Sequence, residues 1–289
     1  MKKLILTLAL GVALGGLTAT AGSITVKGSD TLVILAQKWA ETYMGKNSGV
    51  KIQVTGGGTG TGFAALQNQT TDLCDASRKI KAKEIEACMK VFVGNKRPTE
   101  YKVAVDGLSV YVSADSTVKE LSMDQLEGIF TGKIKNWKDV GGADAPITVY
   151  SRENSSGTYE FFKESVLKGK DFVASAQTMP GTAAVLQAVG KDKNGIGYGG
   201  AAYGSGAKHL AVKRDAASAA IEPSEENVLR GIVKSDEGYP ISRYLYVYVN
   251  PAQDKGEIAA YLGWIRGEEG QKIVKDVGYY PLPEHLRQK

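Results

Sequence analysis

The chain has 289 residues and a formal net charge of +5, with lysines and acidic residues interleaved along the sequence. This interleaving is typical of solvated surfaces and argues against a nucleic-acid-binding protein, which usually carries a concentrated basic stripe. With only two histidines and two cysteines, the composition also disfavours a metal site.

The first 21 residues have the pattern of a cleaved secretory signal. Lys2 and Lys3 precede an apolar run of about 14 residues, shorter than the roughly 20 that span a bilayer as a transmembrane anchor. The run ends at small residues, Ala19 and Ala21, with the spacing that a signal peptidase accepts. No cysteine follows it, so no lipid anchor is expected. Cleavage would remove two lysines, leaving a net charge of +3, and release a soluble, periplasmic or extracellular protein.

Short β-branched runs alternate with helical patterns from the expected mature start, which is typical of βαβ units and a largely parallel sheet. "SITVKGSD" predicts a strand and turn, and "TLVILAQKWAETYMGK" an amphipathic helix. A second strand, "VKIQVT", leads through the turn "GGGTGTG" into the helix "FAALQNQT". Further along, a strand is expected at 147–150 and a helix at 159–167.

Two strand-like runs are longer than the others, "YKVAVDGLSVYVS" at 101–113 and "YPISRYLYVYVN" at 239–250. A chain that leaves one α/β lobe and returns to it needs two passages, so these runs are candidates for crossovers. The helical stretch at 256–278 would then complete the first lobe. The length of the chain also favours two lobes over one core.

The two cysteines, Cys74 and Cys88, flank a charged segment that favours a helix. In an oxidising compartment we favour a disulfide that closes this short loop over two free thiols.

Enzyme signatures are weak in this sequence. "GTGFAA" and "GIGYGG" fit a relaxed dinucleotide pattern, but the second shows no clear helix start after it and neither is joined to a P-loop lysine. A serine nucleophile needs an oriented base, and neither His209 nor His285 lies near a nucleophile-elbow motif. We therefore expect a protein without a catalytic residue or a cofactor.

Gly, Ser and Thr recur where a strand passes into a helix, at 28–32, at 56–62 and at 154–158. Such junctions present backbone N–H groups and short hydroxyls at the positive end of a helix dipole. Helix capping explains any single junction equally well. Three of them together, with Arg152 ahead of the third, predict a shared site for a small oxyanion, because a guanidinium matches two oxygens of a tetrahedral anion.

The motifs "GSDTL", "GGGTGTGFAAL", "CDASRKI", "FTGKIKNWKDVGG", "YSRENSSGTYEFF" and "YPISRYLYVYV", in this order, resemble the PstS family, the phosphate-binding proteins of ABC-type importers. The resemblance covers nearly the whole expected mature chain. It implies an α/β type II periplasmic-binding-protein fold, with two lobes joined by two crossover strands. The expected division is a signal at 1–21, a first lobe at 22–105 and 246–289, and a second lobe at 106–245.

The resemblance also implies the phosphate contacts. They fall on hydroxyls, backbone groups and an arginine at Thr31, Leu32, Thr59, Ser77, Arg152, Ser156, Gly157 and Thr158. Thr59 stands where Ser is commoner.

Two departures concern the carboxylate that the family places in its site. Arg78 and Asn154 occupy positions where well-known long members have Asp, and we expect Arg78 and Asp106 to be phosphate-binding residues as well. We expect Asp106 to take over this role, held ionised by Arg78 or Arg152, with Asp30 as the second candidate. An ionised carboxylate would accept a hydrogen bond from the protonated oxygen of phosphate and disfavour sulfate, which carries no proton. Alternatively, Asp106 merely caps the turn before Gly107.

The sequence thus predicts a secreted, monomeric protein that captures inorganic phosphate and delivers it to the membrane permease and ATPase of an ABC importer. A phosphate-sensing protein, an adhesion protein and a secreted phosphate-recognising enzyme are the alternatives on the same fold, because fold does not fix function.

Overall fold

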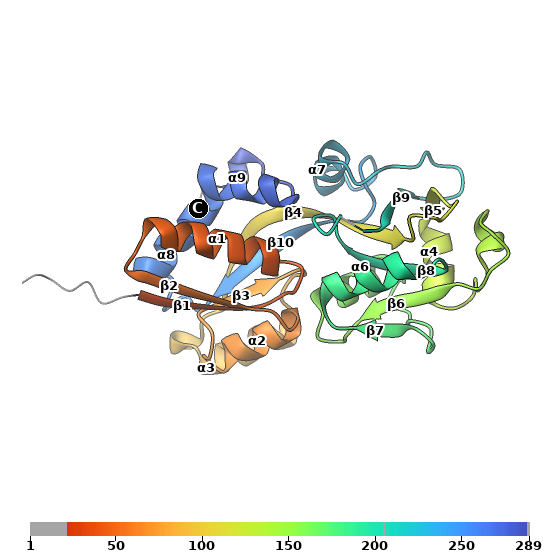
Figure 1. The fold of residues 1–289 in the computed structure, drawn as a ribbon. Coiled ribbons are helices and arrows are strands. Elements are labelled where there is room, and N and C mark those ends of the chain that lie inside the picture. The colour runs from red at the N-terminus through yellow and green to blue at the C-terminus, as the bar shows by residue number, and fades with distance from the viewer. Residues whose placement is uncertain (1–21, 205, 288–289) are drawn as a thin grey trace, which may run out of the picture.

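The computed structural model describes residues 22–204 and 206–287 as two α/β lobes side by side (Figure 1). The predicted secretory signal lies outside these residues. Within these two ranges, no helix combines the length and the apolar composition needed to cross a bilayer.

The first lobe is built from both ends of the described chain. Its parallel strands place β1 between β2 and β3, with α1, α8 and α9 on one face of the sheet and α2 and α3 on the other (Figure 1). Its elements are β1 (Gly22–Gly28), α1 (Val33–Lys46), β2 (Val50–Thr55), α2 (Thr59–Gln67), β3 (Leu73–Ala76), α3 (Ala82–Val91), η1 (Val93–Asn95), α8 (Gly256–Arg266), α9 (Glu268–Val277) and η3 (Glu284–Leu286).

The second lobe comes from the middle of the chain, and β6 pairs in parallel with both β7 and β8. Its elements are β5 (Glu120–Ser122), α4 (Met123–Phe130), η2 (Trp137–Val140), β6 (Thr148–Arg152), α5 (Gly157–Ser165), β7 (Gln177–Met179), α6 (Gly181–Lys191), β8 (Gly195–Gly200), β9 (Lys208–Lys213) and α7 (Glu225–Val233).

Two long strands, β4 (Thr99–Val112) and β10 (Ser242–Val249), pass between the lobes as the sequence predicted. They pair with each other antiparallel, and they also run antiparallel to their outer neighbours β8 and β3. The sheet is therefore parallel within each lobe and antiparallel at the crossovers, which corrects the expectation of a largely parallel sheet. Burial on both faces explains why β4 is mostly apolar from residue 103 to residue 112, where Asp106 and Ser109 are the exceptions.

Each lobe has its own apolar core. One core packs Trp39, Tyr261 and their neighbours against the first lobe's sheet, and the other packs Phe130, Phe162 and Tyr198 in the second lobe. Along β4 the side chains change from the first core to the second between residues 104 and 105. The exact lobe boundaries given above remain a prediction.

The "GIGYGG" stretch forms strand β8 rather than a nucleotide-binding turn. Its glycines let helix α6 approach the sheet closely, because a Cβ at Gly197 would lie 2.6 Å from Val185 Cγ1. This use of glycine requires no ligand.

The predicted disulfide was wrong, because Cys74 on β3 and Cys88 on α3 are free thiols. Both are fully buried in an apolar cluster with Phe63 and Leu66, where cysteine serves as a small hydrophobic residue. Burial raises the pKa of Cys88 to about 11, so this thiol stays protonated and weakly nucleophilic.

A buried carboxyl group in the first lobe should make stability depend on pH. Asp75 on β3 is 4% exposed, and desolvation raises its pKa from 3.8 to about 7. The folded state thus keeps a proton that the unfolded chain releases, so the free energy of unfolding should fall by about 1.4 kcal/mol per pH unit between these two values. Asp75→Asn should remove this decline, giving a larger gain in melting temperature over the wild type at pH 8 than at pH 5.

Thermal unfolding at the two pH values, at constant ionic strength, measures this difference. The matched control is Asp115→Asn on the exposed surface, which should show no such trend. An Asp75→Asn effect of equal size at both pH values would contradict the prediction.

Candidate functional site

Four predicted hydroxyls meet at the carboxyl ends of parallel strands, where ligands bind in open α/β sheets. Thr31 follows β1, Thr59 and Ser77 follow β2 and β3, and Thr158 lies in the first turn of α5 after β6. The hydroxyl of Thr158 lies 2.8 Å from that of Thr31 and 3.4 Å from that of Ser77, which is 3.3 Å from that of Thr59. None of these residues is more than 1% exposed. This hydroxyl cluster therefore joins three segments of the first lobe to one of the second.

The start of α5 is shaped for close approach. Ser156 caps the helix, because its hydroxyl oxygen accepts the Tyr159 N–H at 3.2 Å, while its own O–H hydrogen can still be donated elsewhere. Gly157 follows, and a Cβ there would lie 2.3 Å from Thr59 Oγ1. Glycine thus lets the helix N-terminus, with its free N–H groups, reach the hydroxyl cluster. The capping alternative applies to Ser156 without excluding a ligand.

Leu32 lies beside the cluster, but its backbone group is engaged locally. Its N–H donates to the carbonyl of Ser29 at 3.0 Å in the turn that precedes α1, and its side chain is fully buried. Of the predicted contacts in this segment, the Thr31 hydroxyl is therefore the one placed in the cluster.

Arg152, 2% exposed, reaches across the lobes to a carboxylate next to the cluster. Its guanidinium donates to Asp30 at 2.8 Å, to the Thr182 hydroxyl at 3.0 Å and to Glu153 at 3.2 Å. Asp30 precedes Thr31 and also accepts the Gly57 N–H at 2.8 Å. Arg152 is thus linked to the hydroxyl cluster through Asp30 and not by a direct bond.

Arg78 turns away from the cluster. Its guanidinium makes two bonds to Glu84, at 2.8 and 2.9 Å, and an ion pair with Glu160 of the second lobe. Lys81 pairs with the same Glu160 at 2.7 Å. Arg78 and Lys81 therefore connect the two lobes beside the site.

Asp106 is fully buried and paired with an arginine that the sequence analysis did not select. Its Oδ2 accepts from Arg243 Nε at 2.9 Å and Nη2 at 2.7 Å, and its Oδ1 accepts from the Ala201 N–H at 3.1 Å. The prediction that Arg78 or Arg152 holds Asp106 ionised was therefore wrong. The turn-capping alternative fails as well, because Asp106 and Gly107 both lie inside strand β4.

Arg243 brings a positive charge to the hydroxyl cluster. It faces Asp106 across the β4–β10 pair, donates to the Ser77 carbonyl at 2.9 Å and to the Thr158 hydroxyl at 3.2 Å, and is 4% exposed. A usable sequence signal existed, because Arg243 and Asp106 each interrupt an apolar strand and charged residues are rarely buried unless paired.

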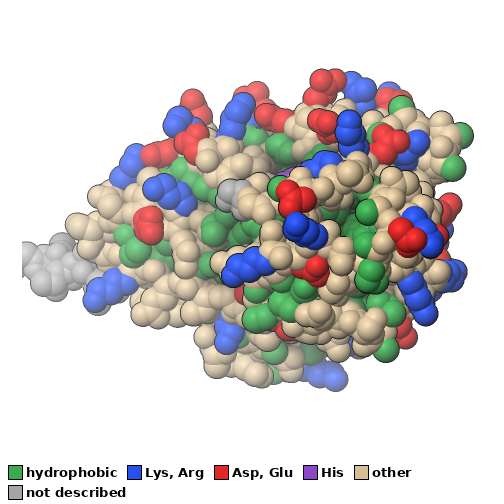
Figure 2. All heavy atoms as spheres, turned by 45° about the vertical axis from the view of Figure 1, so that its right-hand side comes forward, with side chains coloured by type: hydrophobic (Ala, Val, Ile, Leu, Met, Phe, Trp, Pro, Cys, Tyr) green, Lys and Arg blue, Asp and Glu red, His purple; other side chains and the backbone are tan. Residues whose placement is uncertain are grey.

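The site thus offers many hydrogen-bond donors but little net charge, because Arg152 is paired with Asp30 and Arg243 with Asp106. In the part of the chain that the structure describes, no group of three or more His, Cys, Asp or Glu is placed to hold a metal ion. On the face that Figure 2 shows, Lys and Arg lie among Asp and Glu rather than in a single basic stripe.

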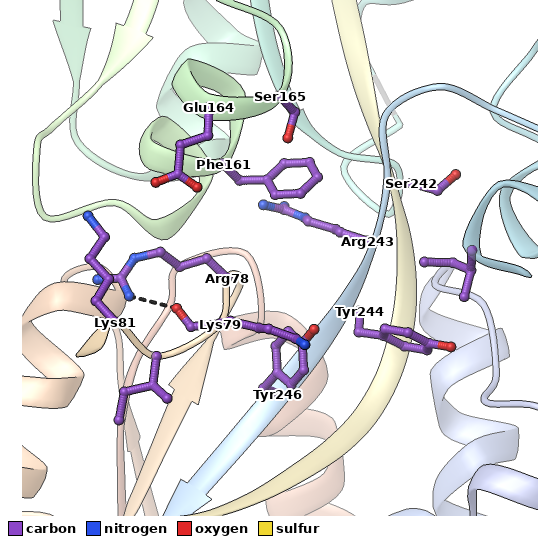
Figure 3. Close-up of a pocket in the computed structure, with 12 residues that line it drawn as sticks. Arg78, Lys79, Lys81, Phe161, Glu164, Ser165, Ser242, Arg243, Tyr244 and Tyr246 are labelled. Carbon is purple, nitrogen blue, oxygen red and sulfur yellow. Dashed lines mark hydrogen bonds between the residues drawn. The ribbon is translucent and has the colours of Figure 1, made fainter. Parts of the chain in front are cut away.

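A cavity of about 450 Å³, whose lining residues Figure 3 shows, adjoins the hydroxyl cluster through Arg243, which lines it and donates to Ser77 and Thr158. It is bounded by the segment between β3 and α3, by α5 and by β10, and Figure 3 shows the Arg243 side chain extending from β10 toward Phe161 of α5.

Comparison with known proteins gives concordant matches. Residues 16–269 match the model of the PBP superfamily domain. The chain is 35% identical over 288 residues to the phosphate-binding protein PstS of Pseudomonas aeruginosa, covering 94% of this chain and 87% of that protein. It is 32% identical over 265 residues to PstS of Bacillus subtilis, covering 91% and 82%.

One solved structure resembles the fold closely. It is a Clostridium perfringens protein assigned to phosphate ABC transport as a substrate-binding protein and crystallised with bound phosphate. The TM-score is 0.80 at 28% identity, covering 91% of this chain and all of that one.

The Asp106–Arg243 pair should show strong energetic coupling in unfolding experiments. Arg243→Met leaves a buried carboxylate unpaired, and breaking such a pair costs about 3–5 kcal/mol. The double variant Arg243→Met, Asp106→Asn should recover most of this loss. Urea unfolding of the wild type, both single variants and the double variant measures the coupling.

The matched control is the exposed pair Lys272–Asp276 on α9, for which a much smaller coupling is expected. Additive effects of the two substitutions at Asp106 and Arg243 would contradict the prediction.

Proposed function

The chain belongs to the PstS family of phosphate-binding proteins, and from that premise we propose that it captures inorganic phosphate at the hydroxyl cluster between its lobes. The family is one of transport binding proteins, not of enzymes. The observation that carries the proposal is the contact of Thr158 from the second lobe with Thr31 and Ser77 from the first.

A bound phosphate would replace the contacts that the hydroxyls now make with one another. Each hydroxyl of the cluster would donate to a phosphate oxygen, as would Ser156 and the N–H groups of Gly157 and Thr158 at the start of α5. Arg243 already donates to Thr158 and would add a charge-assisted bond. Because the donors come from both lobes, the anion would hold the lobes together.

Further contacts between the lobes surround this site. The Gly60 N–H donates to the Ser155 carbonyl at 2.8 Å, and Arg152 pairs with Asp30. Release of phosphate would require these bonds to break while β4 and β10 keep the lobes connected. Arg152 and Arg78 would thus act on lobe closure more than on the anion itself.

We further propose that the protein is a secreted, periplasmic monomer that delivers phosphate to the permease and ATPase of an ABC importer. It would perform no chemical step and need no cofactor. The sensing, adhesion and enzyme alternatives gain no support from the geometry. His209, the candidate base of the enzyme alternative, lies on β9, where its ring packs against that of Tyr111. Burial lowers the pKa of its imidazole.

Phosphate binding should depend on the cluster hydroxyls. Calorimetry of dialysed protein should show one site per chain, and saturating phosphate should raise the melting temperature by mass action. Thr158→Val should weaken binding at least tenfold, because a hydrogen bond to a charged group is worth about 1.5–3 kcal/mol and 1.4 kcal/mol is tenfold in affinity.

The matched control is Thr71→Val, which removes a buried hydroxyl just before β3, at the other end of that strand from Ser77. Its phosphate affinity should equal that of the wild type. A wild-type protein whose unfolding curve does not respond to phosphate would refute the proposed function.

Discrimination against sulfate should reside in Asp106. Its Oδ1 accepts a single N–H and keeps a lone pair for another donor. Both this oxygen and Thr31 Cγ2 lie near Gly200, where a Cβ would be 3.3 Å from the first and 3.1 Å from the second. Oδ1 would therefore accept a hydrogen bond from the O–H of phosphate, whereas sulfate, which has no O–H, would face an unpaired negative charge. In competition binding, sulfate should compete with phosphate in Asp106→Asn and stay excluded in Asp30→Asn.

If sulfate stays excluded in Asp106→Asn while phosphate affinity is unchanged, Asp106 is a structural residue and the acceptor lies elsewhere.

A further inference from the structure

The cavity beside the hydroxyl cluster is much larger than a single phosphate requires. Its volume of about 450 Å³ falls within the range of pockets that hold organic ligands, about 300–1,000 Å³. None of the four hydroxyl residues lines it. The cluster and the cavity are therefore neighbouring but separate spaces.

Arg243 is the side chain that separates them. It lines the cavity, and on its other side its guanidinium donates to the Ser77 carbonyl and the Thr158 hydroxyl, residues that do not line the cavity. In Figure 3 it lies between β10 and the Phe161 ring of α5, whose centroid is 5.2 Å from the guanidinium carbon. The guanidinium thus forms part of the wall between the two spaces.

This wall is held firmly in place. Asp106 fixes the guanidinium through two bonds, at 2.9 and 2.7 Å, and both side chains are almost completely buried. If Arg243 moved aside, the Asp106 carboxylate would remain buried without its partner, which is strongly unfavourable.

The cavity itself suits an uncharged organic group. Phe161, Ile232, Tyr244 and Tyr246 give it apolar and aromatic surface. Of its cations, Arg78 and Lys81 are paired with Glu84 and Glu160, and Arg243 is paired with Asp106. The remaining cation, Lys79, is matched by the Glu164 carboxylate in the same lining, so the cavity offers little net positive charge for a second phosphoryl group.

We propose that Arg243 determines the specificity of the site for unesterified phosphate, an inference that rests on the proposed function. A phosphomonoester needs an opening through which its bridging oxygen can leave the hydroxyl cluster. The space that would accept its organic group lies beyond Arg243, and the guanidinium closes the way. Removal of this side chain should join the two spaces and admit phosphomonoesters with small uncharged groups.

The test compares two double variants that differ in side-chain volume alone at position 243. Arg243→Ala with Asp106→Asn opens the wall, whereas Arg243→Met with Asp106→Asn keeps it filled, and Asn avoids an unpaired buried charge in both. The expected mature chain is titrated by calorimetry with inorganic phosphate, phenyl phosphate and pyrophosphate, and thermal unfolding checks that each variant is folded.

The quantity compared is the ratio of the dissociation constants for phenyl phosphate and phosphate within each protein, so that a general loss of affinity cancels. The ratio should be at least 100 in the wild type. Because both double variants share Asp106→Asn, they are compared with each other, and the ratio should be at least tenfold lower in the Ala double variant than in the Met double variant. Pyrophosphate should gain less than phenyl phosphate. Arg78→Ala is the matched control, because it enlarges the same cavity without opening the wall and should keep the wild-type ratio.

Equal ratios in the Ala and Met double variants would overturn the inference, as would a wild type that binds phenyl phosphate as tightly as phosphate or an Arg78→Ala variant that gains the ester. If the Ala double variant does not fold, Arg243→Ser with Asp106→Asn replaces it, with the same expected ratio. Failure of the proposed function is a separate result, since the wild type would then not bind phosphate at all.

Discussion

The ion pair between Asp106 and Arg243 is the interaction on which the rest of the site depends. The two residues face each other on the strands that connect the lobes, and both are almost completely buried. Charges buried in this way are tolerated only when they are paired and hydrogen-bonded. Because Asp106 fixes the guanidinium, the remaining N–H groups of Arg243 point to the Ser77 carbonyl in one lobe and to the Thr158 hydroxyl in the other. The position of the cluster relative to both lobes is thus set at the crossover.

This arrangement makes the site rich in donors but poor in net charge. Arg152 is paired with Asp30 as Arg243 is with Asp106, so neither guanidinium is a free cation. Attraction for an anion then comes from hydroxyls and from the N-terminus of α5, which are oriented dipoles in a buried place. Such interactions are screened by salt much less than exposed charges. A site of this kind binds by the number and direction of its hydrogen bonds, and this favours one anion shape over others of equal charge.

The sequence predicted the hydroxyls well and the charged partners poorly, for a physical reason. The four hydroxyl residues follow strands of parallel sheets, and the carboxyl ends of such strands meet at one edge regardless of side-chain contacts. They are Thr31, Thr59, Ser77 and Thr158. Ion pairing has no such rule: Asp106 lies closer in the sequence to Arg78 and Arg152 than to Arg243, and only the register of β4 and β10 selects its partner. The disulfide prediction was wrong for a similar reason. An oxidising compartment favours pairing of two cysteines, but the apolar packing around Cys74 and Cys88 holds both as buried free thiols.

The short motif at the start of α5 shows how local conformation and binding are combined. Ser156 caps the helix and Thr158 places its hydroxyl among those of the first lobe, while Gly157 between them leaves room for Thr59. Any side chain at position 157 would push the lobes apart, because its Cβ would lie 2.3 Å from the Thr59 oxygen. Gly58 has the matching role on the other lobe, with φ of +93° and a position where a Cβ would lie 2.6 Å from the Ser155 carbonyl. The two glycines let the backbones of the lobes approach each other, so the hydroxyls of α2 and α5 can converge on one small anion.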